Sequence, residues 1–492
     1  MSVFYTVMFY LGCSAGAKVS EVGPSGRVKE TLLAGRSLCL ATALMTMTAT
    51  WVGGGFVNGT AESVATLGLA WAQAPWGYAL SLVLGGLLFA KPMRRRHFTT
   101  MLDPLTDRFG KKMAALLYLP ALTGEIFWTG AVLTALGTTF GFILQIDFSA
   151  SILLSAFIAI LYTSLGGLRG VAKTDVFQLI ILILGLMLAL PFILPGEGIS
   201  GVWTKYQSVM GEKASPFPSL SWGDSYYLWW DYALLLIFGG IPWHVYFQRV
   251  LSSRDEFTAR WLSIGAGGLC LVAAFPAVII GMVSATTDWG AMGLSGPVTS
   301  SITLPYVLKF LTPGIVAMVG LGALAAAVMS SVDSSILSAS SMGAWNIYRP
   351  LISRQDNPEN LPVIIKRLIW IIGITATLIA LKIQSVYALW FLCSDFVYCI
   401  LFPQLVTALF DRRANVAGSL SGFIVALVLR LGGGEPVLGI PRWIDYPMVD
   451  TAGVVNFPFR TFSMLCALLS IIIVSRMTKR WYAPQPLVDR NP

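Results

Sequence analysis

Two tryptophans stand at points where an apolar helix would be interrupted. Trp51 precedes three glycines in TMTATWVGGGFVNGTAE (46–62), and Trp243 follows two glycines and a proline in GGIPW (239–243). Proline removes a backbone donor and glycine weakens a helix, so both stretches can unwind. Electron-rich ring faces beside unwound backbone favour the binding of a quaternary ammonium cation by cation–π contacts.

Two further aromatic residues, Tyr78 and Trp128, lie at the middle of neighbouring apolar runs. Together with Trp51 and Trp243 they would supply several faces of a cage for such a cation. The chain contains 16 tryptophans, however, and tryptophan is also common in protein cores and at bilayer interfaces. The spacing therefore leaves ordinary packing open as the alternative for each ring.

Hydroxyl and carboxyl groups form a second set of candidates. The apolar run GLGALAAAVMSSVDSSILSASS (320–341) contains Ser330, Ser331 and, near its middle, Asp333. Hydroxyl and carbonyl oxygens are the hard ligands that suit Na⁺, although small residues also let helices pack closely. An acid inside the membrane is functional by default. Asp175 begins another apolar run, where it either caps a helix or coordinates an ion.

Membrane helices must position these residues. Only 12% of the 492 residues are charged, against about 25% in soluble domains, and mean hydropathy is +0.73. The apolar blocks are continuous and long enough to cross a bilayer, which excludes a β-barrel. We predict an all-α polytopic membrane protein with about thirteen spans, near 2–17, 37–61, 64–90, 112–146, 149–168, 174–195, 226–248, 261–286, 313–347, 366–384, 386–410, 415–431 and 461–478.

The two interrupted spans are the second and the seventh. They occupy corresponding positions in two successive groups of five, which is typical of an inverted-repeat carrier with its site at the bilayer midplane. Glycine used only for close helix packing is the alternative. We divide the chain into a short first span with a cytoplasmic linker (1–36), a first repeat (37–200), a second repeat (201–411), and two C-terminal spans with a short tail (412–492).

The basic residues predict the orientation. With the N-terminus outside, the greater part of the 33 lysines and arginines falls in cytoplasmic segments, Arg249 among them, and the C-terminus is cytoplasmic. The net charge of +9 then faces the anionic leaflet of the bilayer and needs no nucleic acid as partner. The sequence shows neither a phosphate-cradling loop nor a metal-ligand cluster, so we expect neither an ATP-driven pump nor an enzyme.

Several long stretches together resemble the sodium/solute symporter family, and within it the members that carry choline. The resemblance runs from about residue 37 to 478 and rests on residues 46–62, 239–253 and 326–342, and on GLAWAQAP (68–75), FAKPMR (89–94), TMLDP (100–104) and GGEP (433–436). It implies a leucine-transporter-type fold with an extra first helix. The first predicted span is shorter than in the family, and we expect no long cytoplasmic tail.

The resemblance also implies an activity and a set of residues. The activity is Na⁺-coupled, Cl⁻-dependent import of choline across the plasma membrane for acetylcholine synthesis, at presynaptic terminals and on synaptic vesicles. The choline cage falls on Trp51, Tyr78, Trp128 and Trp243. One sodium site falls on the carbonyls of Ala49, Val52 and Ala327 and the hydroxyls of Ser330 and Ser331, and a second uses Asp175 and Asp333.

Two other classes of function stay open at this point. A symporter for another solute, such as a sugar or proline, would share the fold, although indole rings at both breaks argue against a neutral polar ligand. A channel or a non-transporting sensor is the other alternative, and we find no continuous polar pore motif that a channel would need. The sequence assigns no chloride site, stoichiometry or oligomeric state.

Overall fold

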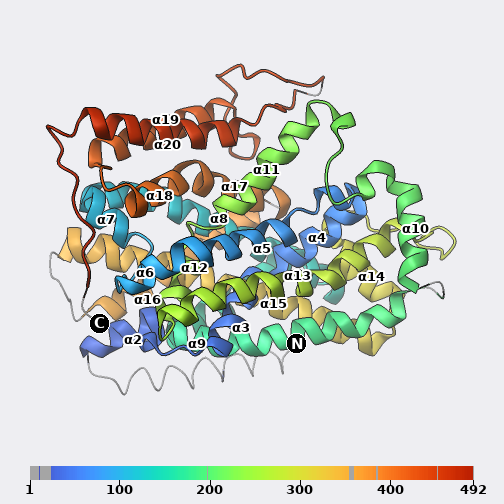
Figure 1. Cartoon of the computed structure of the whole chain (residues 1–492). Helices are drawn as coiled ribbons and strands as arrows, with labels where there is room; N and C mark the ends of the chain where they lie inside the picture. Colours follow the sequence, from blue (N-terminus) through green and yellow to red (C-terminus); the bar gives the residue numbers. More distant parts are fainter. Residues whose placement is uncertain are drawn as a thin grey trace.

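A computed structural model describes Tyr10, Gly196 and residues 24–194, 198–353, 360–383, 386–451 and 453–490. These residues form helices joined by loops and short turns (Figure 1). The helices are α2 (Pro24–Leu33), α3 (Leu40–Trp51), α4 (Gly54–Thr66), α5 (Ala74–Leu84), α6 (Lys91–Arg95), α7 (Asp103–Phe109), α8 (Lys111–Leu144), α9 (Phe148–Ile193), α10 (Gly198–Met210), α11 (Ser225–Gly239), α12 (His244–Ser252), α13 (Glu256–Thr286), α14 (Thr303–Leu311), α15 (Gly314–Met342), α16 (Leu361–Lys382), α17 (Val386–Phe396), α18 (Phe402–Phe410), α19 (Val416–Gly432) and α20 (Phe459–Met477).

The prediction of a polytopic helical membrane protein is confirmed. Within the described ranges, nine helical segments are long and apolar enough to cross a membrane, and the bent pair α3 and α4 makes a tenth candidate. The helix α19 is apolar but shorter. The predicted first span, 2–17, lies outside the described residues apart from Tyr10, so the total of thirteen stays a prediction.

The helix α9 contains two of the predicted spans, 149–168 and 174–195. Its backbone turns at Gly167, whose φ of +54° is a conformation that L side chains rarely adopt. The side chains of Tyr162 and Gln178 meet across this turn. A straight helix would hold them about 24 Å apart. The segment α9 is therefore a helical hairpin that makes two passes.

The second span is interrupted where the glycines stand. Helix α3 ends at Trp51 and α4 begins at Gly54, with a bend of 52° between them. A Cβ atom on Gly53 would lie 1.9 Å from Ser331 Oγ, and one on Gly54 would lie 2.2 Å from Val328 Cγ2. Unwinding and close packing, which we had treated as alternatives, therefore occur together: the glycines bring the interrupted backbone directly against α15.

The seventh span shows the corresponding interruption. Helix α11 ends at Gly239, a short turn follows, and α12 begins at His244. Both α12 and the interrupted α3–α4 pack on α15, which also contacts α8 and α9. In Figure 1, α9 runs along the lower edge of the molecule, below the other helices of this group. The two interruptions thus meet around one central helix.

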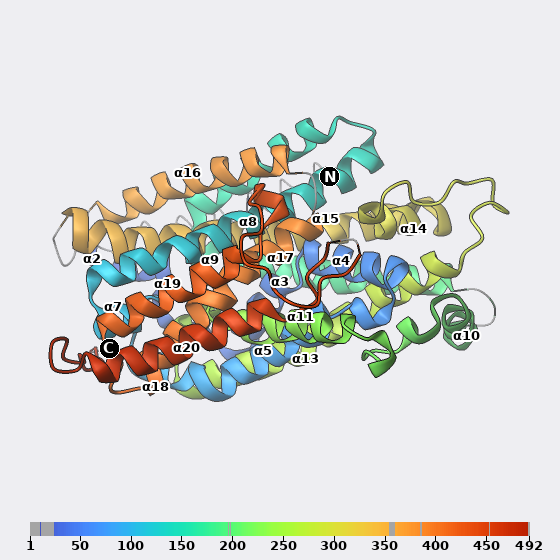
Figure 2. The ribbon, with the colours of Figure 1, turned by 90° about the horizontal axis from the view of Figure 1, so that it is seen from above.

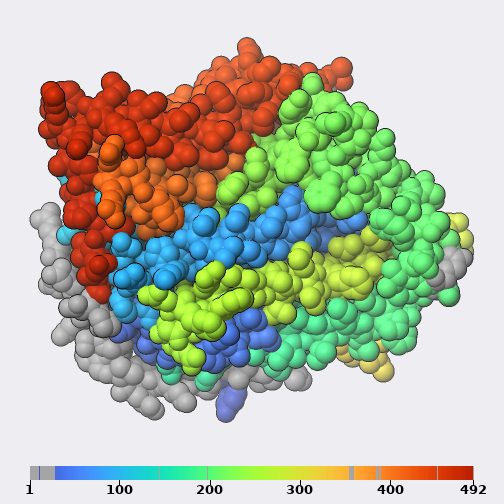
Figure 3. Space-filling model, viewed as in Figure 1, coloured from blue at the N-terminus to red at the C-terminus, as the bar shows by residue number. Residues whose placement is uncertain are grey.

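The C-terminal helices lie at one edge of the molecule. Helices α19 and α20 pack against each other, and α20 also contacts α18 (Figures 1 and 2). In the space-filling view the segment after α20 runs down the left edge of the molecule (Figure 3). It ends at α7, where Arg490 forms ion pairs with Asp103 at 2.6 Å and with Asp107 at 2.9 Å.

Candidate substrate and ion sites

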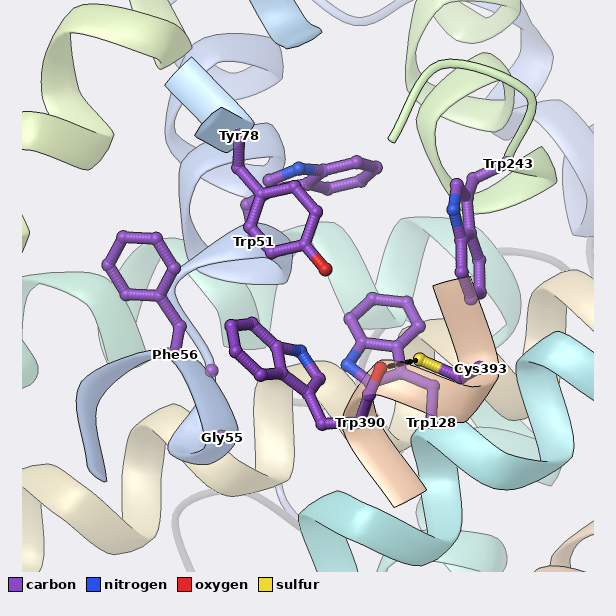
Figure 4. A pocket seen from close by; sticks show the side chains of 9 residues that line it. Trp51, Gly55, Phe56, Tyr78, Trp128, Trp243, Trp390 and Cys393 are labelled. Atoms are coloured by element: carbon purple, nitrogen blue, oxygen red, sulfur yellow. Dashed lines mark hydrogen bonds between the residues drawn. The ribbon is translucent and has the colours of Figure 1, made fainter. Parts of the chain in front are cut away.

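A pocket opens between the two interruptions (Figure 4). Its walls come from five separate stretches of chain: the α3–α4 break, α5, α8, the α11–α12 break and α17. The lining residues are Trp51, Gly53, Gly55, Phe56, Tyr78, Trp128, Trp243, Trp390 and Cys393. The structure therefore brings all four predicted cage residues to one place.

The rings meet edge to face and form adjoining walls. The centroid of Trp51 lies 6.4 Å from that of Tyr78 and 6.2 Å from that of Trp128, with interplanar angles of 84° and 67°. Trp128 lies 5.3 Å from Trp243 at 75°, and Tyr78 lies 5.7 Å from Trp390 at 67°. Rings at such steep angles turn several faces toward a common space, as Figure 4 shows.

None of the nine described lining residues is charged. Two of the rings direct their polar groups to other parts of the protein: Trp243 Nε1 donates to the carbonyl of Gly239 at 2.7 Å, and the Tyr78 hydroxyl lies 3.2 Å from Ser394 Oγ. Trp51 Nε1 is buried without a hydrogen-bond partner among the described residues. A ligand with a carboxylate or a primary amine would find few partners here. A methylated ammonium group needs no hydrogen bonds and is attracted by ring faces, so this chemistry fits the pocket best.

Oxygen atoms gather beside the pocket, where α15 meets the end of α3. Ser330 Oγ lies 2.9 Å from the carbonyl oxygens of both Ala49 and Ala327. Ser331 Oγ donates to the carbonyl of Thr50 at 3.1 Å. The last carbonyls of a helix have no partner within it, so those at the end of α3 are available to a cation. Val52 directly follows α3 as its C-cap residue and precedes Gly53.

The two predicted intramembrane acids are both fully buried and lie near each other. Asp175 Oδ2 accepts hydrogen bonds from Thr46 and from Arg249, the latter at 3.3 Å. Asp333 Oδ2 accepts one from the Tyr162 hydroxyl at 2.8 Å. Capping, one of our two interpretations of Asp175, is wrong, because the residue lies within α9 and its side chain points into the helix bundle.

Sequence reasoning missed two important residues. Arg249 was assigned to a cytoplasmic segment because it follows the seventh predicted span. It is instead fully buried in α12, where it pairs with Asp175 and lies 2.5 Å from Ser334 Oγ. Trp390 is a further ring of the pocket, in addition to Phe56 and the four predicted rings, and it lies in an uninterrupted helix with no local signal to distinguish it from other tryptophans.

Comparison with known proteins agrees with this geometry. The family model described as "Sodium:solute symporter family" matches residues 32–426. The chain belongs to this family. It is therefore a transporter and not an enzyme, and its family couples solute movement to sodium.

Several members of the sodium:solute symporter family resemble the chain over most of its length. The high-affinity choline transporter 1 of Drosophila melanogaster is 46% identical over 98% of this chain and 78% of the relative. The human protein of the same name is 44% identical over 97% of this chain and 84% of its own length. The sodium/glucose cotransporter of Vibrio parahaemolyticus is 24% identical over 78% of this chain and 73% of the relative.

The fold agrees with that of a solved symporter. An outward-open, substrate-bound Na⁺-coupled sialic acid symporter has a TM-score of 0.79, with 99% of this chain and 98% of that chain covered, at 17% identity. At this identity the likeness concerns the fold alone. The predicted leucine-transporter-type architecture of this symporter-family chain is confirmed.

Proposed function

We propose that the chain imports choline together with Na⁺ by alternating access. One observation carries the proposal: six aromatic rings line a pocket whose described lining contains no charged side chain. Each cation–π contact contributes about 0.5–2 kcal/mol when it is shielded from water. The similarity to relatives named as choline transporters supports choline itself as the cation.

Sodium has a structural role in this proposal as well as an energetic one. Bound to the carbonyls of Ala49, Val52 and Ala327 and to the hydroxyls of Ser330 and Ser331, it would tie the end of α3 to α15. Trp51 is the last residue of α3, so the same contact fixes one wall of the ring cage. Moving one positive charge inward along the membrane potential releases about 2.3 kcal/mol per 100 mV.

A second sodium at Asp175 and Asp333 forms part of the proposal. These two acids share Arg249 and would carry one uncompensated negative charge between them when both are ionised. In addition, Asp175 Oδ1 is buried without a hydrogen-bond partner among the described residues. Such an oxygen is unfavourable unless a cation or a water molecule meets it. Both observations fit a monovalent cation at this position.

The physiological setting is an extension of the same proposal. We propose that transport requires chloride, that it delivers choline across the plasma membrane for acetylcholine synthesis, and that the protein acts at presynaptic terminals and on synaptic vesicles. The similarity to the high-affinity choline transporters of fly and human supports these points. The chloride-binding residues are left unassigned.

Uptake of radiolabelled choline by cells that express the chain tests the proposal. We expect saturable uptake in Na⁺ medium, loss of uptake when an impermeant organic cation replaces Na⁺, and reduced uptake when gluconate replaces Cl⁻. Betaine, which adds a carboxylate, should compete poorly because the pocket offers no cationic partner. A chain at the cell surface that accumulates no choline in Na⁺ medium would contradict the proposal, whereas binding without uptake would identify a sensor.

A further inference from the structure

Glu125 is a buried acid in α8 that the proposed choline and sodium sites do not use. It is 1% exposed. Its Oε2 accepts a hydrogen bond from Ser335 Oγ at 2.7 Å, and its Oε1 accepts one from Ser338 Oγ at 2.6 Å. Hydroxyl groups of α15, rather than a basic side chain, therefore hold both carboxylate oxygens. Carboxyl and hydroxyl oxygens together are a ligand set for a hard cation.

The charge balance around Glu125 points to a missing positive charge. Arg249 is the basic side chain that acts on it electrostatically, and the same guanidinium also acts on Asp175 and Asp333. The Nη2 atom of Arg249 is already bound to Asp175 and Ser334. Three buried acids thus face one arginine. A buried carboxylate is strongly unfavourable without a compensating cation or a proton.

The position of Glu125 connects it to both cargo sites. Trp128, one turn further along α8, lines the pocket, and Cys393 of the pocket lies close enough to be affected by the charge of Glu125. On α15, Ser335 and Ser338 follow Ser331 at intervals of one helical turn. Glu125 of α8 therefore lies beside the ring pocket. Its two serine partners lie one and two turns along α15 from Ser331, a proposed sodium ligand.

Glu125 also lies on a defined side of these sites. From Trp128 through Glu125, α8 leads back to its first residue, Lys111, beside α7. From Ser331 through Ser338, α15 leads toward Asn346, which donates a hydrogen bond to Asp103 of α7 at 3.0 Å. Both helices thus lead to the end of the bundle that the basic residues predict to be cytoplasmic. Glu125 lies on the path from the pocket to that side.

We propose that Glu125, with Ser335 and Ser338, forms a cation-binding subsite that receives a monovalent cation, choline or Na⁺, as it leaves the central sites inward. This inference rests on the proposed function. In the state described here the two hydroxyls are hydrogen-bonded to both carboxylate oxygens. Separation of α8 from α15 would release both oxygens to the departing cation.

The substitution Glu125→Gln tests the subsite because it keeps the shape and removes the charge. At equal surface expression we expect Na⁺-driven choline uptake to fall about tenfold, equivalent to about 1.4 kcal/mol in the barrier. Equilibrium binding of radiolabelled choline in Na⁺ medium should stay within about threefold of the unmodified protein, since the ring cage is intact. Glu125→Asp, which keeps the charge, should recover part of the uptake.

The same uptake assay identifies the cation that occupies the subsite, and it includes a matched control variant. A raised Na⁺ concentration for half-maximal uptake in Glu125→Gln would identify Na⁺ as the occupant, and an unchanged value with slower inward release of bound choline would identify choline. Thr139→Val is the matched control, because Thr139 is buried on the same helix and its hydroxyl donates to the Ala135 carbonyl of its own helix at 2.7 Å. We expect the control to transport normally.

Two results separate failure of this inference from failure of the proposed function. Uptake by Glu125→Gln equal to that of the unmodified protein, with the same Na⁺ dependence, would overturn the subsite. No uptake by the unmodified protein would instead overturn the proposed function. If Glu125→Gln does not reach the surface, Ser338→Ala tests the subsite instead, because it keeps the charge of Glu125 and removes one ligand. Its choline uptake should fall about threefold. Normal uptake by Ser338→Ala would overturn the subsite.

Discussion

The Oγ atom of Ser330 lies 2.9 Å from the carbonyl oxygen of Ala49, so the middle of α15 is bonded to the last turn of α3. That carbonyl is free to accept because α3 ends two residues later, at Trp51. Trp51 is in turn a wall of the ring pocket. The proposed ion ligands and the proposed substrate cage therefore share one short piece of backbone, which couples the two cargoes physically.

The first prediction concerns this contact. Ser330→Ala removes one oxygen from the proposed sodium site and leaves the pocket unchanged. A neutral hydrogen-bonding group contributes about 0.5–1.5 kcal/mol, so we expect the Na⁺ concentration for half-maximal choline uptake to rise about two- to twelvefold. Maximal uptake at saturating Na⁺ should be largely preserved. The measurement is choline uptake as a function of external Na⁺ at constant ionic strength.

Ser340 provides the matched control for Ser330. It is buried on the same helix, and its hydroxyl donates to the carbonyl of Ile336 in that helix, at 2.7 Å. Ser340→Ala should leave the Na⁺ dependence as it is. If Ser330→Ala shows the Na⁺ dependence of this control, Ser330 is not a sodium ligand.

The second prediction concerns the rings. Trp51→Ala and Trp243→Ala should abolish uptake at normal surface expression, because each removes a wall of the cage. Trp51→Phe and Trp243→Phe should retain part of it, since a phenyl face still attracts a cation, though more weakly than indole. Trp370→Ala is the control: Trp370 contacts Phe157, at a centroid distance of 6.1 Å, and does not line the pocket. Equal uptake by the Ala and Phe variants would count against ring recognition.

The sequence was sufficient to predict the cage residues that accompany a backbone signal. Glycine and proline marked both interruptions, and they identified Trp51 and Trp243 as residues of the site. Trp390 carried no such signal, because α17 is an ordinary apolar helix up to Phe396. The packing of α17 against α8, α4 and α11 brings Trp390 to the pocket. Ring residues on uninterrupted helices therefore need the tertiary structure.

The location of charged residues in the fold was harder to predict from the sequence than the location of the rings. Positive residues near span ends indicated the topology, yet Arg249, one residue beyond a predicted span, is fully buried and paired with Asp175. Hydropathy treats every arginine as a loop residue and cannot detect a partner more than seventy positions away in the chain.

The hairpin of α9 was predicted as two spans because basic residues separate its apolar halves, and the turn at Gly167 agrees with that.

The third prediction concerns Gly53. A Cβ atom there would lie 1.9 Å from Ser331 Oγ and 2.9 Å from Ser331 Cβ, so Gly53→Ala forces α4 away from α15. Overpacking of this kind typically costs about 1–3 kcal/mol. We expect a lower midpoint of thermal unfolding in detergent and a loss of Na⁺-coupled uptake. Ser331→Gly should restore the thermal stability of Gly53→Ala in part but not its uptake, because the proposed ligand is then missing. A Gly53→Ala protein with unchanged stability would show that α3–α4 and α15 are not held this closely.

The fourth prediction concerns the buried pair of Asp175 and Arg249. Breaking a buried ion pair leaves one uncompensated charge and typically costs about 3–5 kcal/mol, whereas replacing both partners is often far less harmful. Arg249→Met and Asp175→Asn should therefore each strongly reduce the yield of folded protein. The double variant should recover more folded protein than either single variant, measured by gel filtration and thermal unfolding.

The same double variant separates stability from transport. It removes Arg249 together with the Asp175 carboxylate, so two of the three buried acids, Asp333 and Glu125, remain. Asp333 keeps its hydrogen bond from Tyr162 but loses its neighbouring ligand for a second sodium. If Asp175 binds Na⁺, the recovered protein should still bind choline in the ring pocket, while its uptake should respond less steeply to Na⁺ concentration. If Asp175 serves only to balance Arg249, removing both charges should restore stability and Na⁺ dependence together. The steepness of the Na⁺ response in folded double-variant protein therefore decides whether this acid is a transport residue or a structural one.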